Sequence, residues 1–157
     1  MSLISVLRVV LFFILALLVS VVLATLVQTQ FNLYELQKIG TTILPADRID
    51  ATLKDLINFS PLMAVIVAAT FIFALPVAEG VSRILKPWRL VVYFLAGAVG
   101  LWVAFQAVDW YAPPPVFIAA TRELPGTLSM MAAVGVGSAL FGRLVRPRAR
   151  RGLRVLG

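Results

Sequence analysis

Few side chains in this sequence are of a type that could do chemistry. It has no cysteine and no histidine, which excludes thiol nucleophiles, Cys/His metal sites and histidine-based acid–base relays. Of the seven Asp and Glu residues, only Glu79 falls within a long apolar run, and Arg83 follows it by four residues. On a helix this order favours an ion pair. We interpret the two as a salt bridge where the membrane ends; a proton, ion or substrate role, or a contact to another subunit, is the alternative.

A second set of candidate residues is Asp109, Arg122 and Glu123, which flank the segment between the last two apolar runs. They could converge on a lipid-modifying site, although a structural salt bridge between Asp109 and Arg122 is the favoured interpretation. No spacing among the acidic residues predicts a metal site or an acid–base pair. The glycines of GAVG and GVGSALFG lie inside apolar runs and lack the lysine of a phosphate-binding loop. We therefore expect no metal and no cofactor, and favour a non-catalytic role over an enzymatic one.

The composition indicates that these residues are carried by a membrane protein. The chain has 157 residues, of which 61% are hydrophobic and 13% charged, and its mean hydropathy is +1.00. Soluble domains are about 45–50% apolar and about 25% charged. The length fits one domain, and the apolar surplus predicts that this domain is embedded in lipid.

Four apolar runs are long enough to cross a bilayer, which takes about 20 residues. They predict spans at about 5–27, 62–84, 90–108 and 127–144. Because the runs are continuously apolar, they favour helices over the alternating strands of a barrel. The first run is too long for a cleaved signal peptide. The predicted fold is an all-α integral membrane protein of one domain, in which Ser60 caps the second span and Pro76 kinks it.

The distribution of basic residues predicts the orientation. Ten of the 14 Lys and Arg residues lie at or beyond the span ends on one side: Arg8 near the start of the first span, Arg83, Lys86 and Arg89 around the turn between the second and third, and six arginines from Arg143 onward. Under the positive-inside rule both termini are cytoplasmic, and residues 28–61 and 109–126 face outward. We expect a bacterial inner membrane. Six arginines at the C-terminus are predicted to bind anionic lipid headgroups rather than nucleic acid: Arg143, Arg146, Arg148, Arg150, Arg151 and Arg154.

The outward segments have their own patterns. The first span is expected to continue past the bilayer as far as Gly40. After Pro45, apolar residues at Ile49, Leu53, Leu56 and Ile57 predict a short amphipathic helix. This helix would lie on the outer surface or cap the bundle, with a partner-docking surface as the alternative. The stretch 112–120 is expected to pack at the interface, in preference to forming a lid.

Small residues recur every four positions in the last two spans and predict close helix packing there. They are Ala96, Gly100 and Ala104 in the third span, and Ala133 and Gly137 in the fourth. The favoured function is an accessory, assembly or stabilising subunit that binds another membrane protein or a second copy of itself. The alternatives are a small transporter or channel component for a lipid or apolar molecule, and a lipid-modifying enzyme.

Overall fold

The computed structural model describes residues 3–111 and 118–145, and every regular element in these ranges is helical. The long helices are α1 (Leu3–Lys38), α2 (Pro45–Asn58), α3 (Ser60–Ile84), α4 (Arg89–Tyr111) and α5 (Leu124–Leu144). Two short 3-10 turns, η1 (Lys86–Trp88) and η2 (Ala119–Arg122), precede α4 and α5. Of these, α1, α3, α4 and α5 are long and apolar enough to cross a membrane. The all-helical fold and the four candidate spans are therefore confirmed.

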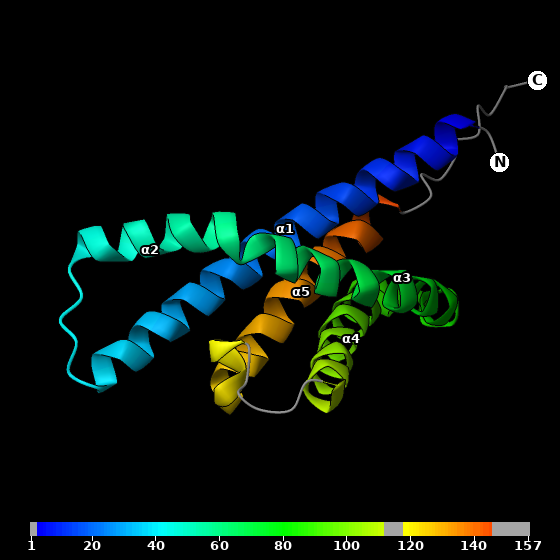
Figure 1. Cartoon of the computed structure of the whole chain (residues 1–157). Helices are drawn as coiled ribbons and strands as arrows, with labels where there is room; N and C mark the ends of the chain where they lie inside the picture. Colours follow the sequence, from blue (N-terminus) through cyan, green and yellow to red (C-terminus); the bar gives the residue numbers. More distant parts are fainter. Residues whose placement is uncertain (1–2, 112–117, 146–157) are drawn as a thin grey trace, which may run out of the picture.

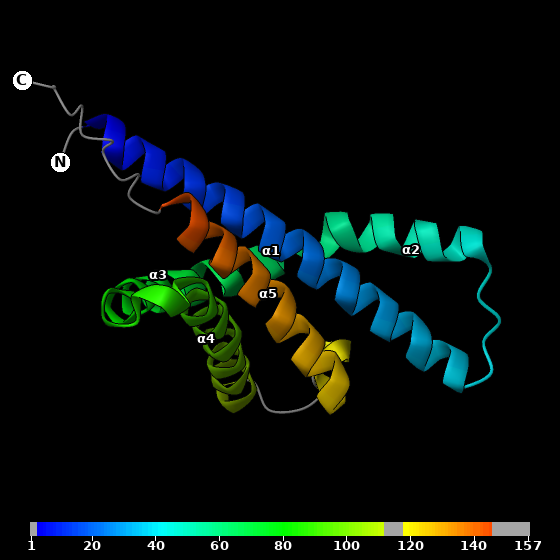
Figure 2. The ribbon, with the colours of Figure 1, turned by 180° about the vertical axis from the view of Figure 1, so that it is seen from behind.

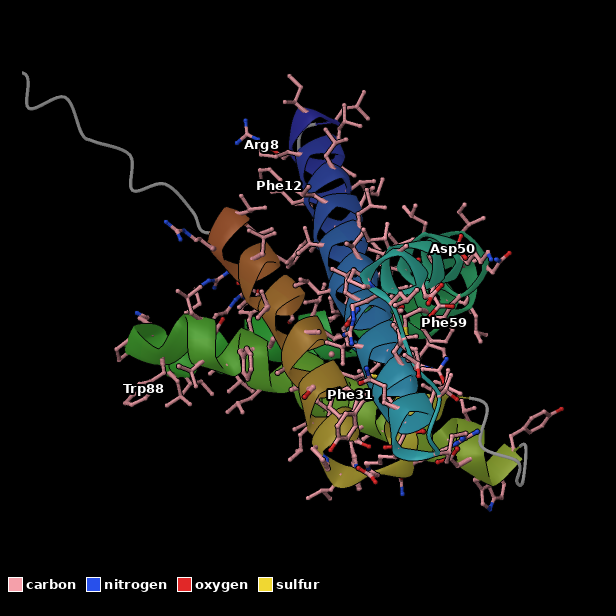
Figure 3. The ribbon with its side chains drawn as sticks, turned by 90° about the vertical axis from the view of Figure 1, so that its left-hand side faces the viewer. Arg8, Phe12, Phe31, Asp50, Phe59 and Trp88 are labelled. Carbon is pink, nitrogen blue, oxygen red and sulfur yellow. The ribbon has the colours of Figure 1, made fainter. Side chains whose placement is uncertain are left out.

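The four long apolar helices form two antiparallel pairs. α1 and α5 lie side by side along much of their length (Figures 1 and 2), and the α3–α4 hairpin crosses behind them (Figure 3). The most extensive interfaces are α4 with α5, α1 with α5, and α3 with α4. α1 begins and α5 ends at the same end of the bundle (Figure 1). We call this the basic end, because α3 also ends and α4 begins there, with Arg83, Lys86 and Arg89.

α5 can pack closely on both sides because it is rich in glycine. A Cβ added at Gly137 would overlap the Ser20 hydroxyl of α1, and one at Gly135 would lie 2.9 Å from ring carbons of Phe94 in α4. Ser20 sits between Ala16 and Ala24, and all three are fully buried. α5 therefore packs against a stripe of small residues on α1, which the sequence pattern did not single out.

α4 presents different small residues to its two neighbours. Gly97 faces α5, where an added Cβ would lie 3.1 Å from the Val134 carbonyl oxygen. Gly100 faces α3, where an added Cβ would lie 2.9 Å from Thr70 Cγ2. Ala96 and Ala104, four residues on either side of Gly100, border the same groove against α3. The last two spans do pack together, as expected, but the Ala96–Gly100–Ala104 stripe serves the α3 interface instead.

The end of α1 and the whole of α2 form an arm of two helices (Figure 1). α1 continues to Lys38, and Gly40 follows with a φ of 90°, the left-handed conformation that ends many helices. α2 begins at Pro45, where the Asp47 carboxylate accepts a 2.9 Å hydrogen bond from the Leu44 amide. It runs back along α1 towards the bundle (Figure 1). The expected amphipathic helix is therefore present.

This amphipathic helix does not cap the bundle. None of its residues is buried, and Ile49, Leu53 and Ile57 are 63%, 57% and 73% exposed. Only Phe59 separates α2 from α3, and Ser60 belongs to α3. The prediction that Ser60 caps the second span is wrong, because its hydroxyl makes no capping bond and instead lies 3.1 Å from the Thr25 hydroxyl of α1. α3 runs through Pro76 without ending there.

Candidate functional site

Glu79 lies at the basic end and accepts hydrogen bonds from three side chains. Tyr93 Oη donates to Glu79 Oε2 over 2.6 Å, and Arg89 Nη2 donates to the same oxygen over 2.8 Å. Arg83 Nε donates to Glu79 Oε1 over 3.3 Å. The Arg83 contact is the i,i+4 pair expected from the sequence. Both carboxylate oxygens are therefore engaged, and about a third of the side chain, 32%, stays exposed.

Arg89 connects three helices at this point. Its side chain is only 13% exposed. Besides Glu79 of α3, its Nη1 donates to Ser82 Oγ over 3.0 Å, and its Nε donates to the Gly142 carbonyl of α5 over 3.1 Å. A guanidinium carries five N–H donors in a fixed fork, which suits several partners at once. A largely buried charge is stable only with such partners, so Arg89 fixes α3, α4 and α5 relative to one another.

Tyr93 completes this group, which we call the Glu79 cluster: Glu79, Ser82, Arg83, Arg89 and Tyr93. The tyrosine is fully buried, and its ring lies against Gly142, where an added Cβ would collide with it. The Arg89 guanidinium lies 5.0 Å from the ring centroid, within cation–π range. The geometry is that of a structural clamp, because both carboxylate oxygens accept from side chains of the two helices that Glu79 joins, α3 and α4.

The sequence pointed to Arg83 alone, but the closer partners come from the next helix. Arg89 and Tyr93 are four residues apart on the first turns of α4. The connection from α3 is only four residues long, from Leu85 to Trp88. A tight hairpin of this kind brings the last turns of one helix beside the first turns of the next. The i,i+4 spacing of Arg89 and Tyr93 after a short turn was the available signal.

Two cavities border these helices. A crevice of about 410 Å³ begins at the Glu79 cluster and runs between residues of α1, α3 and α5, among them Val9, Phe13, Ile72, Pro76 and Phe141. A larger groove of about 680 Å³ lies between α3 and α4. Small and apolar side chains line it, including Ala69, Phe73, Ala96, Gly100, Ala104 and Ala107. Its one polar side chain, Thr70, donates to the Ile66 carbonyl of its own helix over 2.9 Å.

The residues expected at the opposite end are not joined into one site. Glu123 pairs with Lys38 at the end of α1, with 3.0 Å between Oε1 and Nζ, and Lys38 also contacts Glu35 over 2.8 Å. The side chains of Asp109 and Arg122 make no hydrogen bond or ion pair with another described residue. Within residues 3–111 and 118–145, no three acidic side chains are placed to hold a metal ion.

A polar cluster that the sequence analysis did not predict joins α1, α2 and η2 at this end. The Thr29 hydroxyl donates to Asp55 Oδ2 over 2.8 Å, and the Gln28 side-chain oxygen accepts from the Ala120 amide over 2.8 Å. Ile118 and Ala120 are 4% and 1% exposed, so the described part of the stretch before α5 packs into the bundle. Thr25, Gln28 and Thr29 fall inside the long first helix at i, i+3 and i+4, which was the signal for one polar face.

Several expected residues lie beyond the described ranges. Of the C-terminal arginines, Arg143 is exposed at the end of α5. The others (Arg146, Arg148, Arg150, Arg151 and Arg154) and the segment 112–117 lie outside the described residues. Comparison of the chain with protein families, with curated proteins and with solved structures found no match.

Proposed function

We propose that this chain is a non-catalytic, multi-pass protein of the bacterial inner membrane, with both termini in the cytoplasm. In this proposal it is an accessory, assembly or stabilising subunit that packs against another membrane protein. The four apolar helices and the excess of basic residues at one end support the location and the orientation. The contacts of Glu79 support a structural role, because both of its oxygens accept from side chains that tie α3 to α4.

The observation that carries the proposal is the groove between α3 and α4. Within a bilayer, helices associate mainly by close packing, and small residues let the backbones approach. The groove offers the exposed Ala69 and Ala107 to an incoming helix, with the larger Phe73 beside Ala69 on α3. Because the Thr70 hydroxyl donates its proton within its own helix, the side chains that line the groove offer no free hydrogen-bond donor to a polar substrate. A transmembrane helix of a partner fits such a surface.

A transporter remains the alternative, and it requires polar side chains along one path. The polar side chains that could line such a path border different cavities. Thr70 borders the α3–α4 groove, whereas Glu79 and Tyr93 border the crevice. Ser20 and Thr25 are buried in the interfaces of α1. A lipid-modifying enzyme would need Asp109 and Arg122 to meet Glu123, which is instead bound to Lys38. Neither alternative gains an observation of its own.

The test is co-purification of the tagged full chain at native expression level in a mild detergent, with stoichiometry measured by mass spectrometry. We expect one membrane partner in a fixed ratio. Ala69→Phe and Ala107→Phe fill the groove from exposed positions and should abolish the complex while the chain stays folded. Ala132→Phe, an exposed position on α5 outside the groove, is the matched control. A chain that purifies without a stoichiometric partner contradicts the proposal.

A further inference from the structure

The crevice beside the Glu79 cluster has the form of a site for an amphiphile. Its volume of about 410 Å³ lies within the range of roughly 300–1,000 Å³ typical of ligand sites. Apolar side chains from α1, α3 and α5 form its walls, including Val9, Phe13, Ile72 and Phe141. Its polar lining groups are Glu79 and Tyr93, at the basic end. A ligand that fits has an apolar chain and a polar head at one end.

The charge at this mouth indicates which polar head it accepts. Glu79 contributes one negative charge, while Arg83 and Arg89 contribute two positive charges, and Lys86 follows at the start of η1. A cationic head would compete for Glu79 with Tyr93, Arg89 and Arg83, which already donate to its two oxygens. The net positive mouth therefore favours an anionic head.

Arg83 is the residue with free donors for such a head. Only its Nε is used, by Glu79, and its two terminal nitrogens make no hydrogen bond with any described residue. Its side chain is 76% exposed. The terminal N–H groups of a guanidinium match the oxygens of a phosphate in a two-point contact. Arg89 is unsuitable, because its donors are already bound to Ser82, Glu79 and Gly142.

We propose that the crevice holds one acyl chain of an anionic phospholipid, whose phosphate is bound by the terminal nitrogens of Arg83. Arg8 lies at the same end, on the first turns of α1 (Figure 3), and adds to the positive potential there. The proposal relies on the membrane location proposed above, but not on the partner or on the α3–α4 groove. It differs from general attraction to anionic lipid, because it places one lipid on one arginine and in one crevice.

The experiment is native mass spectrometry of the full chain, purified in detergent and offered equal amounts of phosphatidylglycerol and phosphatidylcholine with identical acyl chains. We expect one phosphatidylglycerol per chain, retained in preference to phosphatidylcholine. Arg83→Gln should reduce this preference about fivefold, the effect of one basic residue on lipid attraction. Lys86→Gln removes the same charge one turn away and should leave most of the preference intact. Equal losses in the two variants would overturn the proposal in favour of non-specific attraction.

The acyl chain is tested separately from the head. Ile72 lines the crevice and is 60% exposed, so Ile72→Trp fills the crevice without entering the core. It should remove the retained lipid of either head type, whereas Val136→Trp, an exposed position on α5, should not. Displacement of the lipid by inorganic phosphate alone would overturn the acyl-chain assignment. A chain that retains phosphatidylglycerol but binds no partner would support this inference and contradict the accessory-subunit function. A chain that binds a partner but retains no phosphatidylglycerol would contradict this inference and support that function.

Discussion

The two ends of the bundle hold their helices together by different chemistry. At the basic end, one carboxylate and one largely buried guanidinium join α3, α4 and α5. The contacts at the opposite end include three separate pairs. The Thr29 hydroxyl donates to the Asp55 carboxylate, and the Ala120 amide donates to the Gln28 side chain. The half-exposed Lys38 and Glu123 form an ion pair. One end depends on a single residue that has several partners. The other spreads its contacts over separate pairs.

This difference predicts where the molecule is sensitive. Loss of one partner in a buried charged group leaves the other charge without compensation, whereas loss of one pair among several leaves the rest in place. The basic end should therefore fail as a unit and the opposite end in parts.

Arg89→Met should be the most damaging single change. It leaves Glu79 with only Tyr93 and the weaker Arg83 contact, and it releases the Gly142 carbonyl and Ser82. Breaking a buried pair costs about 3–5 kcal/mol. Because 32% of the Glu79 side chain is exposed, we expect about 2–3 kcal/mol. Thermal unfolding in detergent, followed by circular dichroism, measures the loss.

The matched control for Arg89→Met is the exposed Arg48→Met on α2, whose Nη1 donates to Gln30 Oε1. That variant should unfold within error of the parent. The double variant Glu79→Leu/Arg89→Met removes both charges and should recover much of the stability lost by Arg89→Met alone, since no unpaired charge remains. Additive losses in the double variant would show that the Glu79 cluster is not one unit.

A glycine at each end allows a similar close approach, which makes a second comparison. An added Cβ at Gly142 meets the Tyr93 ring, and one at Gly126 meets the Ala120 carbonyl group. Overpacking of this kind costs about 1–3 kcal/mol. We expect Gly126→Ala to be at least as costly as Gly142→Ala, because backbone yields less than a ring. Gly80→Ala, with nothing within 4 Å of the new Cβ, should be neutral or stabilising in the same unfolding assay. An unfolding temperature of Gly126→Ala equal to that of the parent would contradict this close approach.

Thr29→Val tests the separate contacts of the opposite end. It removes the hydrogen bond to Asp55 while keeping the shape of the side chain, and such a bond is worth about 0.5–1.5 kcal/mol. We expect the effect to be local: faster amide hydrogen exchange in α2, with α3, α4 and α5 unchanged. Thr52→Val is the control, because that hydroxyl bonds only to the Arg48 carbonyl of its own helix. Faster exchange throughout the bundle would show that this end also acts as a unit.

Sequence patterns predicted the helices better than their contacts, for a physical reason. Length and apolarity along one segment are enough to define a span, so the four spans and the α2 amphipathic helix could be predicted. The Glu79–Arg83 pair is also local, four residues apart on one helix. Contacts across helices depend on rotation and crossing of the helices, which no single segment determines. Arg89 with Gly142, and Lys38 with Glu123, are 53 and 85 residues apart.

The faces of the small residues show the same limit. The spacing of Ala96, Gly100 and Ala104 predicted a packing face, and Gly100 packs against α3. The face towards α5 is instead marked by Gly97, the residue after Ala96. Both faces of α4 carry small residues, and the choice between them depends on the neighbouring helices. Ser60 shows a tertiary contact overriding a local preference, since its hydroxyl lies beside Thr25 of α1 and makes no capping bond.

The smallest effect is expected for an exposed ion pair on the α2 arm, and it defines the lower limit of the contrast. Asp50 Oδ2 lies 2.6 Å from Lys54 Nζ, and both side chains are more than 60% exposed, at 62% and 68%. Water screens such pairs. Asp50→Asn should therefore leave the unfolding temperature at neutral pH unchanged within error, unlike Arg89→Met.

The pair should still be visible in a titration. The hydrogen bond and charge of Asp50 raise the pKa of Lys54 above its ordinary value. A raised pKa in the folded chain means that any stabilisation is present below the ordinary lysine pKa and is lost as the pH rises through the raised value. Side-chain NMR of Lys54 in detergent should show its pKa falling in Asp50→Asn. An unchanged Lys54 pKa would show that the pair does not form in solution. A large loss of stability in Asp50→Asn would show that an exposed pair can contribute as much as the contacts of Arg89.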